Sequence, residues 1–84
     1  MDLGLRGKVA IVTASSRGIG RAAAEALAGE GGRITMCART TADVTAAADQ
    51  IRVRTGSEVL AVAADVTRAD DIQRVVDRTI DAYG

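Results

Sequence analysis

A short apolar segment that runs directly into a glycine-containing polar loop constrains the fold of this chain more than any other feature. Residues 9–13 (Val-Ala-Ile-Val-Thr) have the β-branched, apolar character of a buried strand. The loop at residues 14–20 follows, and an alanine-rich segment at residues 21–28 comes next. A strand that turns sharply into a helix directs the free N–H groups of the first helical turn beyond the carboxyl end of the strand. The segment therefore predicts an anion site, most often one for phosphate.

The rest of the chain continues this alternation of strand and helix. Apolar strand patterns cover about residues 8–13, 33–38 and 58–64, and helical patterns cover about residues 21–28, 42–55 and the segment that starts near Arg68. The resulting βαβαβα order predicts an α/β fold: a partial Rossmann fold, with a doubly wound parallel sheet, right-handed crossovers and three parallel strands in the order 3-2-1. Residues 1–84 are thus expected to form about half of a nucleotide-binding domain.

Helical spacing also predicts which face of each helix packs on the sheet. The expected inward residues are Ile19, Ala22, Ala23, Ala26 and Leu27 in the first helix, Val44, Ala47, Ala48 and Ile51 in the second, and Ile72, Val75, Val76, Thr79, Ile80 and Tyr83 in the third. The first strand is apolar throughout and is expected to be buried on both faces. The strand that normally lies beside it in such a fold is missing, so one of its edges is expected to be unpaired.

Composition argues against several classes of function. Acidic and basic residues balance, the pI is near 6.1, and no basic stripe with interleaved aromatic residues occurs, so nucleic acid is not an expected partner. Cys37 is the only cysteine and histidine is absent, which excludes an internal disulfide and predicts no metal site. A reducing, cytoplasmic location is expected. No apolar stretch approaches the ~20 residues of a membrane span, so no membrane association is expected.

Residues 13–20, Thr-Ala-Ser-Ser-Arg-Gly-Ile-Gly, resemble the Thr-Gly-x-x-x-Gly-x-Gly loop of short-chain dehydrogenases/reductases, and residues 5–12 resemble the first strand of that family. The resemblance implies that this loop binds the diphosphate and adenosine ribose of a dinucleotide cofactor. The residues concerned are Thr13, Ala14, Ser15, Ser16, Arg17, Gly18, Ile19 and Gly20. Ala14 replaces the family's first glycine, which costs about 1 kcal/mol if the position needs a positive φ. An ordinary strand-to-helix turn is the alternative interpretation.

Arg39 follows the second predicted strand, at the position where an NAD-binding protein commonly has an acid that binds the ribose hydroxyls. A guanidinium there can instead bind a 2′-phosphate through two charge-assisted hydrogen bonds. Arg17 resembles a second basic contact of the family. Together they predict NADP in preference to NAD. The alternatives are that both arginines are solvated surface residues, or that Asp43 binds a ribose hydroxyl.

Asp65 and Val66 follow the third predicted strand and resemble an acidic and aliphatic pair of the same family. The resemblance implies that the Asp65 carboxylate accepts a hydrogen bond from the adenine amino group and that Val66 lines the adenine ring. Aspartate is also a favourable N-cap, so capping of the third helix is a competing role for Asp65. Both interpretations place Asp65 at the carboxyl edge of the sheet.

The later landmarks of the family do not occur in these 84 residues. They are an Asn-Asn-Ala-Gly segment, a catalytic serine and a Tyr-x-x-x-Lys pair; Tyr83 is followed only by Gly84, and Lys8 is the sole lysine. The resemblance implies the NADP(H)-binding, N-terminal portion of an oxidoreductase that transfers hydride to or from a carbonyl or alcohol carbon. The chain alone is expected to be inactive. The alternatives are a non-catalytic nucleotide-binding module and an interaction module that self-associates through the unpaired edge of the first strand.

Overall fold

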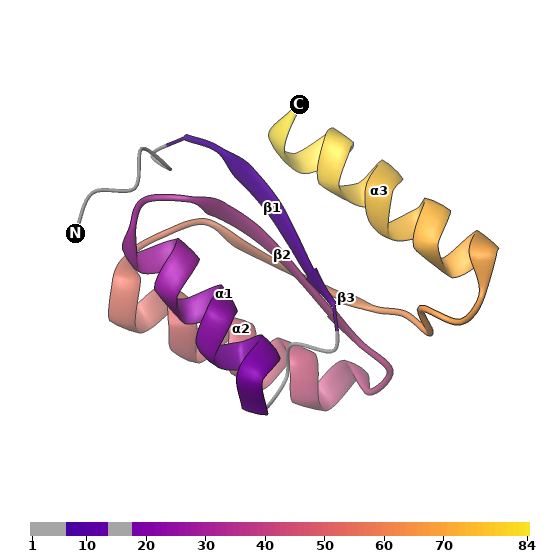
Figure 1. Cartoon of the computed structure of the whole chain (residues 1–84), viewed down its shortest axis with the longest axis horizontal. Helices are drawn as coiled ribbons and strands as arrows, with labels where there is room; N and C mark the ends of the chain where they lie inside the picture. Colours follow the sequence, from indigo (N-terminus) through magenta and orange to yellow (C-terminus); the bar gives the residue numbers. More distant parts are fainter. Residues whose placement is uncertain (1–6, 14–17) are drawn as a thin grey trace.

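The computed structural model describes residues 7–13 and 18–84 and contains alternating strands and helices (Figure 1). The elements are β1 (Val9–Thr13), α1 (Gly18–Gly29), β2 (Arg33–Ala38), α2 (Thr41–Thr55), β3 (Val59–Ala63) and α3 (Ala69–Tyr83). The predicted βαβαβα order is confirmed. The first helix begins earlier than predicted, at Gly18, so part of the predicted loop is helical.

The strands form one parallel sheet in the order β1-β2-β3, which is the predicted order 3-2-1 read from the opposite edge. In the register of the sheet, Val9 is paired with Arg33 and Ile34 with Val59. Helices α1 and α2 lie on one face of the sheet, and α3 lies on the other (Figure 1). Helices on both faces of a parallel sheet are typical of a doubly wound fold, so the predicted fold class is confirmed.

The central strand, β2, forms the middle of the core. Ile34 and Met36 are completely buried and belong to the cluster beneath α1 and α2, whereas Cys37 is buried in a second cluster with Val62 and Val75 of α3. Alternate side chains of a strand point to opposite faces, so β2 contributes to both clusters. The predicted inward residues of α2 are all buried: Val44, Ala47, Ala48 and Ile51.

The prediction for the buried face of α1 is wrong. Ala24 and Ala28 are the buried residues, with Leu27 partly buried beside them, whereas Ala22, Ala23 and Ala26 are exposed. The side chain of Ile19 lies outside the described residues. Alanine occurs on every side of this helix, so the sequence carries little hydrophobic contrast from which a face can be chosen.

The expectation that β1 is buried on both faces is also wrong. Ala10 and Val12 pack against the cluster beneath α1 and α2, but Val9 and Ile11 are 45% and 41% exposed on the other face. β1 pairs only with β2 in the sheet, as expected from the missing neighbour. Because α3 packs on β2 and β3, its predicted inward residues Ile72 and Ile80 remain largely exposed too.

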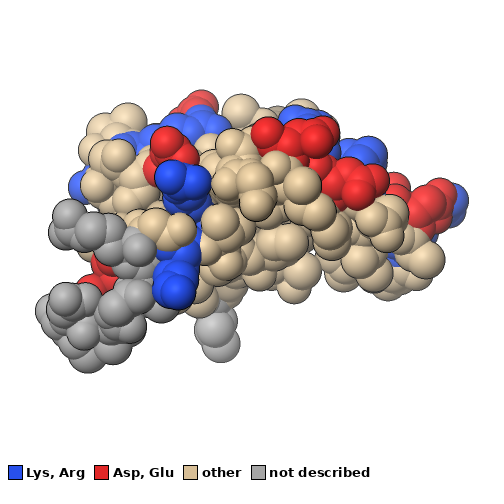
Figure 2. All heavy atoms as spheres, turned by 90° about the horizontal axis from the view of Figure 1, so that it is seen from above, with Lys and Arg blue, Asp and Glu red and all other residues tan. Residues whose placement is uncertain are grey.

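Figure 2 shows the side on which β1 and α3 lie, and a broad uncharged area is visible there. The exposed apolar side chains of β1 and α3 belong to this side of the molecule. None of the helices among the described residues has the length and apolar character needed to cross a bilayer. An area where apolar side chains are exposed is a candidate protein-contact surface.

Polar contacts attach α3 to β2 across the buried interface. The hydroxyl oxygen of Thr79 lies 2.8 Å from that of Thr35, and both residues are buried. The Tyr83 hydroxyl donates a hydrogen bond of 2.9 Å to the Ile34 carbonyl, and the Arg33 guanidinium donates one of 3.4 Å to the Tyr83 carbonyl. Burial raises the pKa of Tyr83 above its ordinary value. The contacts support the structural role that the sequence predicts for Tyr83.

We expect Thr79→Val to lower the free energy of unfolding by about 1–2 kcal/mol, because valine leaves the buried Thr35 hydroxyl without this partner. Thr79→Val combined with Thr35→Val should cost less than the sum of the two single changes, since the double variant leaves neither hydroxyl unpaired. Urea unfolding followed by circular dichroism measures all four proteins. Thr45→Val, at an exposed position of α2, is the control. Strictly additive costs would contradict the coupling.

Candidate functional site

The carboxyl ends of the three parallel strands meet at one edge of the sheet, as parallel pairing requires. β1 ends at Thr13 and is followed, after residues 14–17, by the start of α1. β2 ends next to Arg39, and β3 ends next to Ala64 and Asp65. Among the described residues, the predicted site residues Thr13, Arg39 and Asp65 therefore lie at this edge. In open α/β sheets, ligands bind at this edge.

Gly18, at the start of α1, is exposed where the sequence predicts an anion site. Gly18 opens the helix with φ +69°, a conformation that favours glycine, and a Cβ atom there would meet no other atom within 4 Å. Among the described residues beyond its chain neighbours, no side chain therefore packs against this position. The predicted residues Ala14, Ser15, Ser16 and Arg17 lie outside the described residues, so the second predicted basic contact is not located.

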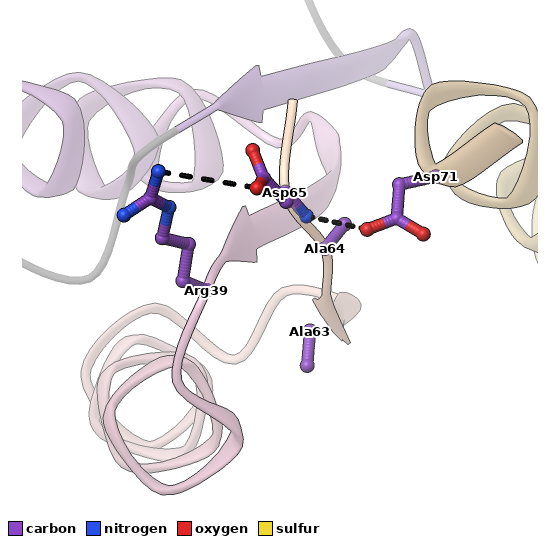
Figure 3. A pocket seen from close by; sticks show the side chains of 5 residues that line it. All are labelled: Arg39, Ala63, Ala64, Asp65 and Asp71. Carbon is purple, nitrogen blue, oxygen red and sulfur yellow. Dashed lines mark hydrogen bonds and ion pairs between the residues drawn. The ribbon is translucent and has the colours of Figure 1, made fainter. Parts of the chain in front are cut away.

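Arg39 and Asp65 face each other across an open pocket of about 450 Å³ (Figure 3). The Arg39 guanidinium lies 3.9 Å from Oδ2 of Asp65. The pocket is lined by Arg39, Ala63, Ala64, Asp65 and Asp71. A basic group, two acidic groups and two small alanine side chains thus lie together, which suits a ligand that carries both an anionic group and hydrogen-bond donors.

Asp65 does not cap α3, which corrects one of its two predicted roles. The N-cap position of α3 is Arg68. Oδ1 of Asp65 accepts hydrogen bonds from the Thr67 N–H at 3.0 Å and from the Thr67 hydroxyl at 2.6 Å. These bonds hold the pKa of Asp65 below its ordinary value of 3.8, with smaller contributions from Arg39 and Arg68. The carboxylate is consequently ionised at neutral pH, and its Oδ2 is directed toward Arg39 (Figure 3).

Asp71, which the sequence does not single out, also lines the pocket. Oδ2 of Asp71 accepts a hydrogen bond of 2.7 Å from the backbone N–H of Asp65, and this bond lowers the pKa of Asp71. Helical spacing places Asp70 and Asp71 together on the polar side of the third helix and offers no means of telling them apart. Asp71 comes six residues after Asp65, and that spacing is the only signal in the sequence.

A family model for short chain dehydrogenases matches residues 8–84. A short chain dehydrogenase/reductase of Aspergillus oryzae is 42% identical in an alignment 82 residues long, which covers 95% of this chain and 31% of that protein. The 3-oxoacyl-[acyl-carrier-protein] reductase of Synechocystis is 37% identical over 82 residues, or 94% of this chain and 32% of the reductase. The chain therefore spans about a third of the length of these relatives.

Solved structures show the same similarity. L-sorbose reductase from Gluconobacter frateurii, complexed with NADPH and L-sorbose, has a TM-score of 0.96 and 40% identity; the match covers all of this chain and 32% of the reductase. A metagenomic short-chain oxidoreductase in complex with NADP has a TM-score of 0.85 and 36% identity, and the match covers 95% of this chain and 36% of that protein. The similarity in sequence and in fold thus extends over nearly the whole chain.

Thr67→Val should raise the pKa of Asp65 toward its ordinary value, because the Thr67 hydroxyl stabilises the ionised carboxylate. A lowered pKa means that Asp65 stabilises the fold above pH 3.8 and that this contribution is lost as the pH falls through the folded-state value. The variant should therefore lose less stability on acidification than the parent chain. NMR titration of the Asp65 carboxyl carbon measures the pKa. An unchanged pKa in the variant would contradict the assignment.

Proposed function

Since the chain belongs to the short chain dehydrogenase family, we propose that its residues form the NADP(H)-binding portion of an oxidoreductase of that family. The observation that carries the proposal is the placement of Arg39 beside Asp65 in an open pocket at the carboxyl edge of the sheet. An acid in place of Arg39 would repel a 2′-phosphate, whereas the guanidinium attracts it. The complexes of similar proteins with NADPH and NADP support the same cofactor.

In the proposed complex, the cofactor diphosphate lies at the start of α1. The free N–H groups of the first helical turn and the positive end of the helix dipole favour an anion there. Gly18 leaves the approach to the backbone open. The other proposed contacts in this segment are Thr13, Ala14, Ser15, Ser16, Arg17, Ile19 and Gly20.

The adenosine end of the cofactor is proposed to occupy the pocket between β2 and β3. Arg39 binds the 2′-phosphate and Asp65 accepts a hydrogen bond from the adenine amino group. Val66 follows Asp65 and is exposed, but it is not among the residues that line the pocket; its proposed contact is with the side of the adenine ring that projects out of the pocket. The Asp65 carboxylate suits this role because it is ionised and only its Oδ1 is engaged by Thr67.

The reaction proposed for the complete enzyme is hydride transfer between the nicotinamide and a carbonyl or alcohol carbon. When bound, the cofactor supplies the hydride or accepts it. The residues of this chain contribute binding and orientation of the cofactor. No residue among them is proposed to act as the general acid or base, because Tyr83 is partly buried and its hydroxyl donates a hydrogen bond to the Ile34 carbonyl. We therefore propose that the 84 residues alone do not turn over substrate.

Arg39→Gln should weaken NADPH binding about tenfold or more and leave NADH binding nearly unchanged, since only NADPH has the 2′-phosphate. Titration of the chain with each cofactor, followed by calorimetry, measures both dissociation constants. Arg78→Gln, at an exposed position of α3, is the matched control. The same samples should oxidise no NADPH when a carbonyl compound is added. Equal losses for the two cofactors, or absence of NADPH binding to the parent chain, would contradict the proposal.

A second candidate function, an interaction module, is favoured by the contrast between the two edges of the sheet. At the outer edge of β3, the Val59 carbonyl accepts a hydrogen bond from Arg52 and the Ala63 carbonyl accepts one from Arg74. β1 has no charged residue along its length, and its exposed Val9 and Ile11 adjoin its outer edge. Uncharged edge strands of this kind pair readily with other chains. The occupant proposed here is β1 of a second copy.

Ile11→Lys should abolish any concentration-dependent assembly of the chain, because a charge on an edge strand opposes strand addition. Analytical ultracentrifugation without cofactor measures the assembly. Val53→Lys is the matched control, since Val53 is an exposed apolar residue on α2, away from the sheet edge. A monomeric parent chain at all concentrations, or equal effects of the two changes, would contradict the interaction module.

A further inference from the structure

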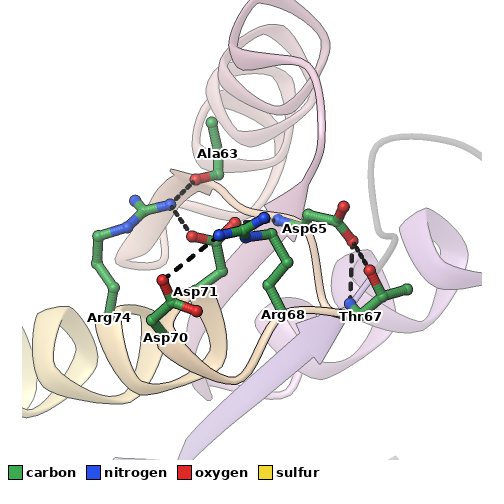
Figure 4. A network of polar contacts seen from close by, with 7 residues as sticks. All are labelled: Ala63, Asp65, Thr67, Arg68, Asp70, Asp71 and Arg74. Carbon is green, nitrogen blue, oxygen red and sulfur yellow. Dashed lines mark hydrogen bonds and ion pairs between the residues drawn. The ribbon is translucent and has the colours of Figure 1, made fainter.

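An acidic and a basic side chain of α3 contact the backbone on either side of Ala64, where the chain leaves β3 (Figure 4). Oδ2 of Asp71 accepts the Asp65 N–H at 2.7 Å, and the Arg74 guanidinium donates to the Ala63 carbonyl at 2.6 Å. The two side chains also lie 3.5 Å apart, as an i, i+3 pair on one side of the helix. Together they contact the backbone of residues 63–65, where Arg74 is the hydrogen-bond donor and Asp71 is the acceptor.

These contacts take the place of a further strand. The N–H of Ala64 donates to the Ala38 carbonyl of β2 at 2.9 Å, so the backbone of Ala64 faces the sheet. The backbone groups of its neighbours Ala63 and Asp65 face the opposite way, since they alternate along an extended chain. Asp71 and Arg74 therefore provide hydrogen bonds that another strand would make, and they fix the backbone from which the Asp65 side chain projects.

We propose that Asp71 and Arg74 are positioning residues for the adenine end of the cofactor, acting through Asp65. The inference rests on the proposed function. Asp71 fixes the Asp65 backbone, and Thr67 fixes Oδ1 of the carboxylate. Oδ2 then remains directed into the pocket beside Arg39 (Figure 3). If the backbone contact is lost, the carboxylate is no longer held where it can accept a hydrogen bond from the adenine amino group.

A comparison of Asp71 with its neighbour Asp70 distinguishes this role from the general effect of an acidic residue at the start of a helix. Both aspartates lie in the first turn of α3, where a negative charge interacts favourably with the helix dipole. The Asp70 side chain is 79% exposed and its ion pair, 3.7 Å long, is with Arg68, whereas the Asp71 side chain is 26% exposed and contacts the β3 exit. Both aspartates can therefore interact with the helix dipole, but only Asp71 contacts the backbone of Asp65 and can position it.

The test compares two ligands that differ in one group: NADPH and its purine analogue, which has a hydrogen in place of the adenine amino group. Asp71→Ala should weaken binding of NADPH about tenfold, the loss expected for a hydrogen bond to a charged group, and should not weaken binding of the analogue. Asp70→Ala should change neither dissociation constant. Asp71→Asn, which retains an acceptor for the Asp65 N–H, should restore most of the affinity for NADPH.

In an Asp65→Ala background, Asp71→Ala should have no further effect, because its action passes through Asp65. If Asp71→Ala does not fold by circular dichroism, Asp71→Glu replaces it: the charge stays, the carboxylate moves by one methylene, and the same adenine-dependent loss is expected. Equal losses for both ligands, or a loss that persists without Asp65, would overturn the inference while the cofactor proposal stands. Absence of NADPH binding to the parent chain would overturn the cofactor proposal and the inference with it.

Discussion

The complete burial of β2 is the constraint on which the rest of the structure depends. This strand has a hydrogen-bonded neighbour on each side and helices over both faces, and the side chains of residues 34–37 have no exposed surface. Alanines of α1 and α2 pack against it, in a chain that lacks Phe and Trp. Because β2 is parallel to both neighbours, all three carboxyl ends meet at one edge. In the sequence, the residues that we propose to contact the cofactor stand at the end of a strand, follow a strand, or lie at the start of α1.

The sequence predicted the elements well, because apolar segments and glycines alternate along it. It predicted the packing faces only where polar and apolar residues contrast. In α2, charged residues such as Asp43 and Arg52 mark the outer side, and the predicted inward residues are buried. In α1, alanines occupy both sides, and the predicted face was wrong. In α3, the predicted inward residues Val75 and Thr79 are buried, but Ile72 and Ile80 are exposed. Burial depends on what lies opposite the helix, and helical spacing carries no information about that.

The site was predictable to the extent that it depends on topology. Arg39 and Asp65 follow strands that are adjacent in the sheet, so the fold class alone brings them together, and the structure places them 3.9 Å apart. Asp71 could not be predicted, because its contact with Asp65 depends on how α3 is placed over the end of β3. The competing role of Asp65 as an N-cap failed for a related reason: Thr67 engages its carboxylate, and α3 begins later, at Ala69.

The proximity of Arg39 to Asp65 is compatible with both proposed contacts. The pair is 3.9 Å long and joins an exposed arginine to a half-buried aspartate, so water and salt screen it and its contribution to stability is small. A 2′-phosphate presents several anionic oxygens to a guanidinium and competes readily with one carboxylate oxygen at that distance. Asp65 does not depend on Arg39 for its orientation, because Thr67 bonds its carboxylate and Asp71 bonds its backbone. In the proposed complex, Arg39 therefore turns to the phosphate while the Asp65 carboxylate stays in place to accept a hydrogen bond from the base.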